Sequence, residues 1–129
     1  EAGAHAHNGA VRRERVRMYQ HLLGDQAQLK LIPHRAGSAC LTQVVRILAQ
    51  NRSRDPAAEL VRVLCAQGYE VRGSYIPLHL IPGLSTCVWD RLPYADRIWS
   101  DLVELPCDTS VGFDELERIA TIAKGVVNT

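Results

Sequence analysis

The sequence predicts a single α+β domain whose helices pack mainly on one face of a small sheet. Helical and strand-like periodicities alternate along the chain, and no internal repeat is present. A chain of 129 residues, 47% of them hydrophobic, is long enough to bury one core. We expect residues 11–129 to form this domain. Residues 1–10 combine Gly, Ala, Asn and His without apolar periodicity, so we expect a flexible arm or a foreign remnant there.

Apolar residues recur at helical spacing in four segments. The clearest is Pro56–Gln67, because Asp55 suits the N-cap, Pro56 the first helical position, and Gly68 the position just past the end. An arginine-rich helix over 11–23 ends at Gly24, and we expect its polar face to contact another domain or subunit. The remaining two helices begin at Pro93 and near Gly112.

Strand signals fall between these helices. Residues 41–48 are rich in β-branched side chains and predict a buried strand. Residues 69–76 alternate Val71, Gly73 and Tyr75 with polar side chains, as a strand with one covered face does. Residues 29–32 predict an edge strand and residues 103–105 a very short one, whereas prolines make residues 77–92 irregular.

Charge and composition exclude several classes of function. Fifteen Lys and Arg against fourteen Asp and Glu leave a net charge of +1, so no electrostatic field recruits nucleic acid. No apolar run approaches the ~20 residues that span a bilayer, so we expect no membrane association. The four cysteines are widely spaced, which favours free thiols over disulfides or a metal site. We therefore expect a cytoplasmic protein.

The residues offer few catalytic combinations. Cys87 follows His79 by eight positions and could form a thiol and imidazole pair, but no third member or anion hole is evident. A metal site at His5 and His7 lacks a nearby carboxylate or thiol. Asp96 is best explained as a solvent-facing helix residue, as is Asp90 just ahead of that helix. Tyr75, His79 and Trp89 lie on or beside the Pro-rich segment, where a rigid loop can hold side chains outward.

Several stretches together resemble one family. Tyr75–His79 reads Tyr-Ile-Pro-Leu-His and is similar to the Tyr-x-Pro-Leu-His element of the DegT/DnrJ/StrS aminotransferases, and it follows an amphipathic helix as it does there. Asp96 stands where that family usually has Glu. The other matching stretches, in the same order as in the family, are Gly68–Arg72, Pro93–Arg97, Leu105–Pro106, the helix from Phe113 to Ala123 and the helix from Arg12 to Leu23.

The resemblance implies a function that this chain cannot perform alone. Members of the family transfer an amino group to a nucleotide-linked keto sugar or a cyclitol, with pyridoxal phosphate held as a Schiff base in a type I dimer. The residues that match belong to the carboxy-terminal small domain, and the cofactor residues belong to the preceding large domain. The chain has only Lys30 and Lys124, which are expected on the surface, so we expect no catalytic and no cofactor-binding residue here. By resemblance, Tyr75 and His79 approach the sugar-nucleotide side of the cleft.

Two hypotheses follow from the resemblance, and a third does not depend on it. The chain is a fragment or domain of an aminotransferase, completed by a large domain and assembling as a homo-oligomer. Alternatively, it is a free-standing interaction or oligomerisation module that keeps the small-domain fold. The third hypothesis is a hydrolase that uses Cys87 and His79.

Overall fold

The computed structural model describes residues 2–48, 54–84, 86–87 and 91–129. A four-stranded antiparallel sheet lies at the centre of the molecule, with strand order β1-β2-β4-β3. Its strands are β1 (Leu29–Leu31), β2 (Thr42–Ile47), β3 (Arg72–Gly73) and β4 (Leu102–Pro106). The helices are α1 (Ala2–Leu23), α2 (Pro56–Ala66), α3 (Pro93–Ile98) and α4 (Phe113–Val127), with short 3-10 turns η1 (Leu78–Leu80) and η2 (Trp99–Asp101).

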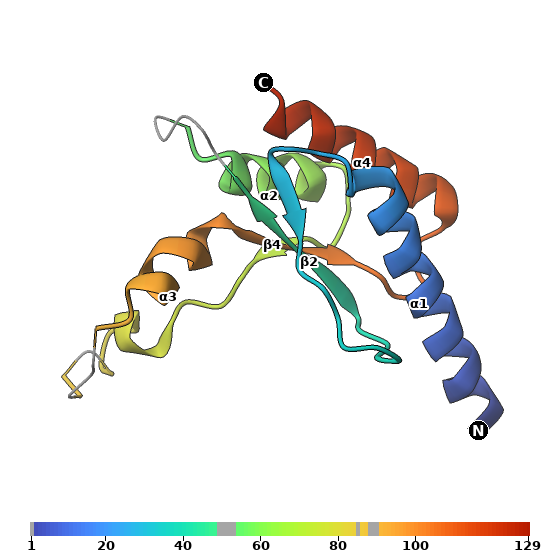
Figure 1. Ribbon diagram of the computed structural model, residues 1–129, viewed down its shortest axis with the longest axis horizontal. Coiled ribbons are helices and arrows are strands. Elements are labelled where there is room, and N and C mark those ends of the chain that lie inside the picture. Colours follow the sequence, from blue (N-terminus) through green and yellow to red (C-terminus); the bar gives the residue numbers. More distant parts are fainter. Residues whose placement is uncertain (1, 49–53, 85, 88–90) are drawn as a thin grey trace.

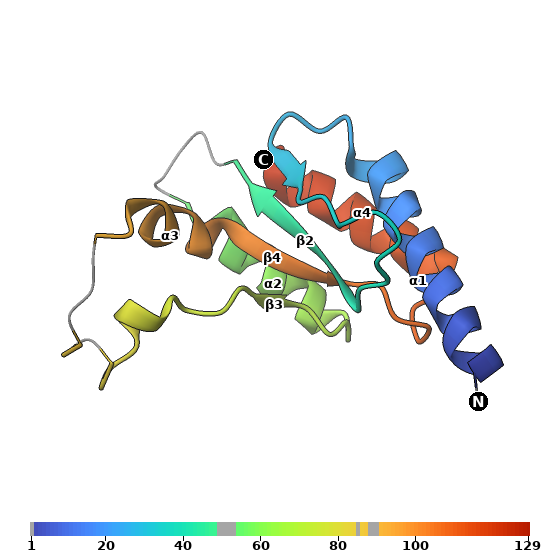
Figure 2. The same ribbon diagram turned by 60° about the horizontal axis from the view of Figure 1, so that its bottom comes forward.

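Helices α1, α2 and α4 cover one face of the sheet, with α4 packed against both of the others (Figures 1 and 2). The alternation of β2 shows which face is covered, because Gln43, Val45 and Ile47 are buried while the residues between them are only partly so. The prediction of a small α+β sheet with helices mainly on one face is confirmed. No helix among the described residues is long and apolar enough to cross a membrane.

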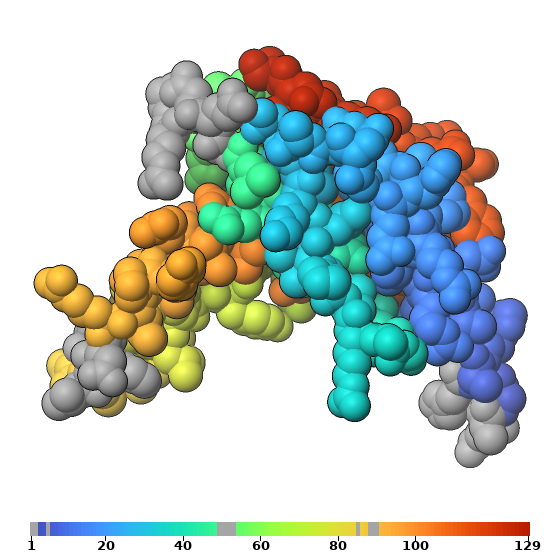
Figure 3. Space-filling view, viewed as in Figure 1, coloured from blue at the N-terminus to red at the C-terminus, as the bar shows by residue number. Residues whose placement is uncertain are grey.

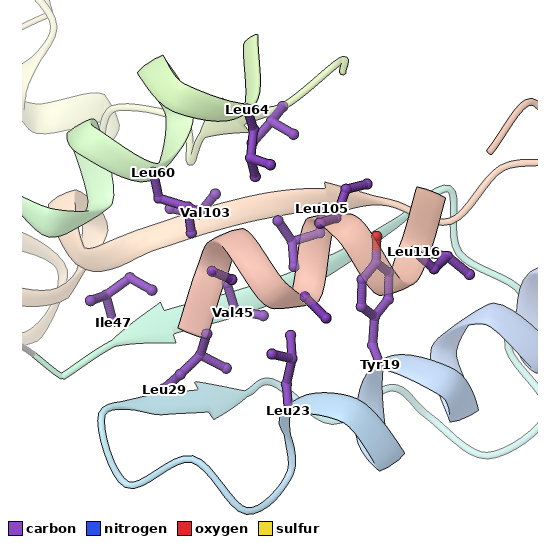
Figure 4. Packing of buried hydrophobic residues seen from close by; sticks show 14 of the residues in the cluster. Tyr19, Leu23, Leu29, Val45, Ile47, Leu60, Leu64, Val103, Leu105 and Leu116 are labelled. Carbon is purple, nitrogen blue, oxygen red and sulfur yellow. The ribbon is translucent and has the colours of Figure 1, made fainter. Parts of the chain in front are cut away.

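The enclosed core lies between this face and the three helices (Figure 4). Val45 and Val103 are directly opposite each other on neighbouring strands, and neither is exposed. Leu60 of α2 and Leu116 of α4 close the layer from the helical side. We use "enclosed core" for the following residues and the buried residues that touch them: Tyr19, Leu23, Leu29, Val45, Ile47, Leu60, Leu64, Val103, Leu105 and Leu116.

The first helix is longer than predicted. It begins at Ala2, so residues 2–10 are helical, where we expected a flexible arm or a foreign remnant. Alanine has the highest intrinsic helix propensity, and this segment alternates Ala with other residues, which favours the helix even where Gly3 and Ala4 are exposed. The absence of apolar periodicity therefore does not exclude a helix in this segment.

Arg15 of α1 also differs from expectation. Its side chain is buried, its Nε donates to the carbonyl oxygen of Val111 at 2.7 Å, and its Cζ lies 5.3 Å from the centroid of the Phe113 ring. One helical turn further on, the Tyr19 hydroxyl donates to the carbonyl oxygen of Pro106 at 2.9 Å. These two contacts attach α1 to the chain around β4 and α4 of the same domain, so Arg15 is not part of an outward docking face.

Two strands differ in length from their predictions. Residues 69–76 were expected to be extended throughout, but β3 comprises only Arg72 and Gly73. Gly68 has φ +89° and turns the chain at the end of α2, where Tyr69 N–H donates to the Leu64 carbonyl instead of to a strand. Conversely, β4 extends over five residues and occupies the interior of the sheet between β2 and β3.

The chain between β3 and η2 leaves the body of the domain. We call residues 74–98 the projecting segment; it includes η1 and α3, and residues 85 and 88–90 within it are outside the described part. Both ribbon views show η1 and α3 at a distance from the three covering helices (Figures 1 and 2). The predicted helix from Pro93 is only Pro93–Ile98, and it continues as the 3-10 turn η2.

Candidate functional site

Tyr75 lies two residues beyond the end of β3 and is the more accessible of the two predicted substrate-contacting residues. Its side chain is exposed, at 74% of its maximum. The guanidinium Cζ of Arg72 lies 5.2 Å from the centroid of its ring, within the range of a cation–π contact. The backbone ahead of Tyr75 is fixed, because Ser74 N–H donates to the Leu102 carbonyl at 3.2 Å. Tyr75 is therefore an exposed aromatic ring on an anchored piece of backbone.

Arg72 is itself held by a carboxylate of the central strand. Its Nε donates to Oε2 of Glu104 at 2.8 Å, and the two residues are direct cross-strand partners. The Glu104 side chain is only 10% exposed, whereas that of Arg72 is 61% exposed. The hydrogen bond and the negative charge of Glu104 raise the pKa of Arg72 above its usual value. A row of three side chains, Glu104, Arg72 and Tyr75, thus leads from the sheet to the surface.

His79 lies on η1, and the structure gives it a carboxylate partner that sequence reasoning missed. Its Nε2 is 2.5 Å from Oδ1 of Asp96 on α3. The imidazole side chain is only 11% exposed, and that of Asp96 is 50% exposed. Asp96 is exposed, as predicted for a solvent-facing helix residue, and it also contacts His79. Only the resemblance, which places an acidic residue there after the Tyr-x-Pro-Leu-His element, offered a signal of this contact.

The described residues provide no support for the thiol and imidazole pair of Cys87 and His79 or for a metal site. Cys87 is exposed, and the hydrogen bond described for Nε2 of His79 is directed at Asp96, not at a thiol. Trp89 and Asp90 lie outside the described residues. The four cysteines are all free thiols, and burial raises the pKa of Cys107 to about 12. Within the described residues, no three His, Cys, Asp or Glu side chains gather as a metal site would require.

The projecting segment exposes large apolar side chains. In the space-filling view its yellow and orange atoms extend from one end of the main body (Figure 3). Aliphatic and aromatic groups at this density are unusual on a surface that faces only water. The exposed members are Tyr75, Ile76, Leu78, Leu80, Leu84, Leu92 and Tyr94.

A separate cleft of about 600 Å³ is lined by Arg46, Arg54 and Arg97 near the start of α2. Two of these cations already have carboxylate partners. Arg54 pairs with Glu59 of α2, and Nε of Arg46 lies 3.6 Å from Oδ2 of Asp101. Asp55 also lines the cleft and caps α2 by accepting from the Ala58 N–H at 3.0 Å. The charges in this cleft therefore largely balance one another.

The residues of the chain do not fit pyridoxal phosphate as a complete site. The cofactor requires an amine to bind it covalently and a charge partner for its ring. Lys30 is exposed on β1, and Lys124 is half-buried in the last turns of α4. Neither lysine lines a cleft described above, and neither is near Tyr75 in the sequence or in the strand pairing.

An antiparallel sheet covered on one face and carrying a projecting segment is an architecture found in aminotransferases. An aminotransferase from Streptoalloteichus hindustanus superposes with a TM-score of 0.77 at 23% identity, over 95% of this chain and 32% of that one. A candidate sugar aminotransferase from Streptococcus pneumoniae, solved in its PLP-form, has a TM-score of 0.82 at 18% identity, over 95% and 32%. A Helicobacter pylori aminotransferase involved in the biosynthesis of pseudoaminic acid has a TM-score of 0.80 at 12% identity, over 95% and 33%.

The sequence identifies the family. Residues 5–124 match the DegT/DnrJ/EryC1/StrS aminotransferase family, and the chain belongs to it. The predicted resemblance is thereby confirmed. No curated protein sequence matches the chain. The chain spans about a third of the length of the solved structures it resembles.

Proposed function

We propose that the chain is the carboxy-terminal small domain of a pyridoxal-phosphate-dependent aminotransferase that acts on a nucleotide-linked sugar or a cyclitol. Membership of the family and the likeness to sugar aminotransferases support this proposal. Tyr75 and His79 are its substrate-lining residues. Tyr75 offers an exposed aromatic side chain, and His79 contacts Asp96 within the same segment. The chain is cytoplasmic in this proposal, in keeping with its free thiols.

The observation that carries the proposal is the exposed apolar surface of the projecting segment. Leu78 is 60% exposed and Tyr94 is 76% exposed, whereas Leu60 of α2 and Leu116 of α4 are fully buried. Such a surface is stabilised when another protein surface covers it. The solved relatives are about three times as long as this chain, so the proposed cover is the large domain of a parent aminotransferase.

Pyridoxal phosphate provides a direct test of where the cofactor residues lie. When it is titrated into the purified chain, we expect no Schiff-base absorption band that saturates at one equivalent. Slow reaction at the two lysines is expected to disappear in the variant carrying Lys30→Arg and Lys124→Arg, which leaves only reaction at the α-amino group. A band that saturates at one equivalent, and that is lost in that variant, would show that this chain holds the cofactor by itself.

The second candidate function is a free-standing oligomerisation module. The same exposed apolar side chains support it, because like surfaces of two copies can cover each other. Sedimentation equilibrium at rising concentration separates the two candidates. Leu41 is about as exposed as Leu78 but lies outside the projecting segment. The oligomerisation module is supported if Leu78→Glu dissociates the dimer and Leu41→Glu does not. A monomer at all concentrations counts against it.

A further inference from the structure

We propose that Arg72 is a positioning residue for Tyr75: Glu104 fixes the guanidinium, and the guanidinium holds the phenol ring in the orientation in which it meets a ligand. The proposal rests on the proposed role of Tyr75 in lining the substrate and adds two residues to it. Neither Arg72 nor Glu104 is a site candidate in the sequence, where Arg72 is a polar member of an alternating segment and the end of the matching stretch Gly68–Arg72.

The first step of the argument is the rigidity of the base. Glu104 belongs to the central strand β4, is 8% exposed as a residue, and has a strand on either side of it. A carboxylate in such a place is stable when a charged donor satisfies it. Nε of Arg72 does so at 2.8 Å, from the directly opposite position on β3. The guanidinium plane therefore has one edge fixed to the sheet.

The second step concerns the ring. Tyr75 is three residues beyond Arg72, and its backbone is held only up to Ser74 by the sheet hydrogen bond to Leu102. An exposed tyrosine without a neighbour samples several rotamers. The cation at 5.2 Å covers one face of the ring and favours the rotamer that keeps the contact. Tyr75 remains 74% exposed, so much of the side chain is accessible to a ligand.

The chain contains a matched comparison. Tyr94 also contacts an arginine, with Cζ of Arg97 at 5.9 Å from the ring centroid, and it is 76% exposed. No described hydrogen bond or ion pair joins Arg97 to a carboxylate, so this arginine is not fixed to the sheet as Arg72 is. The pairs Arg72–Tyr75 and Arg97–Tyr94 therefore have similarly exposed tyrosines, but only in the first does a carboxylate of the sheet hold the arginine.

The test is fluorine NMR on the 129-residue chain labelled with fluorotyrosine, which gives one resonance for each of the four tyrosines. Tyr75→Phe and Tyr94→Phe assign the two exposed rings. We expect the Tyr75 resonance of the unmodified chain to differ from its position in urea. In Arg72→Leu it should move to that position and narrow, and in Arg72→Lys it should move partway, because a point charge retains attraction without the planar stack.

Two controls keep the result specific. The resonance of fully buried Tyr19 reports folding and should stay in place in both Arg72 variants. Arg97→Leu should move the Tyr94 resonance and leave that of Tyr75 unchanged. A Tyr75 resonance that stays in place in Arg72→Leu, or that already lies at its urea position in the unmodified chain, would overturn the proposal. Because no sugar nucleotide is involved, a failure of the proposed function would leave this measurement unaffected.

Discussion

The enclosed core and the projecting segment differ in how far the chain covers their apolar side chains. In the core, Val103 and Leu105 of β4 are fully covered by helices of the same chain. In the projecting segment, Ile76 and Leu78 are about half exposed or more, and polar contacts at Tyr75 and His79 attach it to its surroundings. The difference teaches that the chain covers the apolar side chains of its core itself, while in the projecting segment it leaves apolar side chains exposed.

The largest expected contrast between the two regions is in thiol reactivity. Burial raises the pKa of Cys107 from 9.0 to about 12, so its thiolate fraction at pH 8 falls about a thousandfold below that of an ordinary thiol. Exposed Cys87 in the projecting segment should react with iodoacetamide at the rate of a free thiol. Mass spectrometry of tryptic peptides over time measures both rates. Equal rates would mean that the core opens freely.

The same shift gives a pH dependence with a definite sign. The folded state keeps the Cys107 thiol neutral, whereas the unfolded chain ionises it near pH 9. Stability from this group is therefore fully present below pH 9 and declines as the pH rises towards 12. Urea midpoints at pH 8 and pH 10 should show the decline, and Cys107→Ala should reduce it.

Truncation of the core should cost far more stability than truncation of the projecting segment. Leu105→Ala removes a fully buried side chain between the sheet and the helices, and we expect a loss of about 2–5 kcal/mol in urea unfolding. Leu78→Ala, at a side chain that is 60% exposed, should change the free energy of unfolding by less than about 0.5 kcal/mol. Similar losses at both positions would erase the distinction between the two regions.

A smaller effect is expected where α1 is attached to the core. The Tyr19 hydroxyl is buried, which raises its pKa, and it donates to the Pro106 carbonyl. Tyr19→Phe keeps the ring but leaves that carbonyl without this donor, so we expect a loss of about 1–3 kcal/mol. Tyr94→Phe is the matched exposed control and should be neutral in the same thermal or urea unfolding experiment.

The smallest effect is expected at the rim of the core, where α2 begins. Asp55 accepts from the Ala58 N–H, and Asp55→Ala should cost about 1 kcal/mol. Asp55→Asn retains an acceptor and should restore most of that loss. If the two variants are equally unstable, the charge of Asp55 and not its cap contact is what stabilises α2.

Local signals in the sequence were sufficient for most of the fold. The helix α2 begins at Pro56 as predicted, because its N-cap and its closing glycine act within a few residues. The length of β3 could not be predicted in this way. Alternation over 69–76 describes which side chains could face a core, but a strand continues only while a neighbour pairs with it. Gly73 pairs with Val103, and the Ser74 N–H reaches the carbonyl of Leu102, the residue at which β4 begins.

The candidate site shows the same limit. Tyr75 and His79 were found because the Pro-rich element that contains them resembles a family motif. Their partners were not found, since Arg72 and Glu104 are 32 positions apart and His79 and Asp96 are 17 apart. Charged residues at such separations give no local pattern, and only strand register and the path of the projecting segment bring them together. The roles of Tyr75 and His79 in binding a substrate stay predictions.

The position of β4 also constrains how the domain is made. Strands β2 and β3 are not neighbours; each pairs with β4, which is translated some thirty residues after β3. A nascent chain that has not yet reached Pro106 therefore carries two strands with no shared partner. The four-stranded sheet can therefore form only after residues 102–106 have been synthesised. Non-local strand pairing of this kind is slow, and until it is complete the strand edges stay exposed to aggregation.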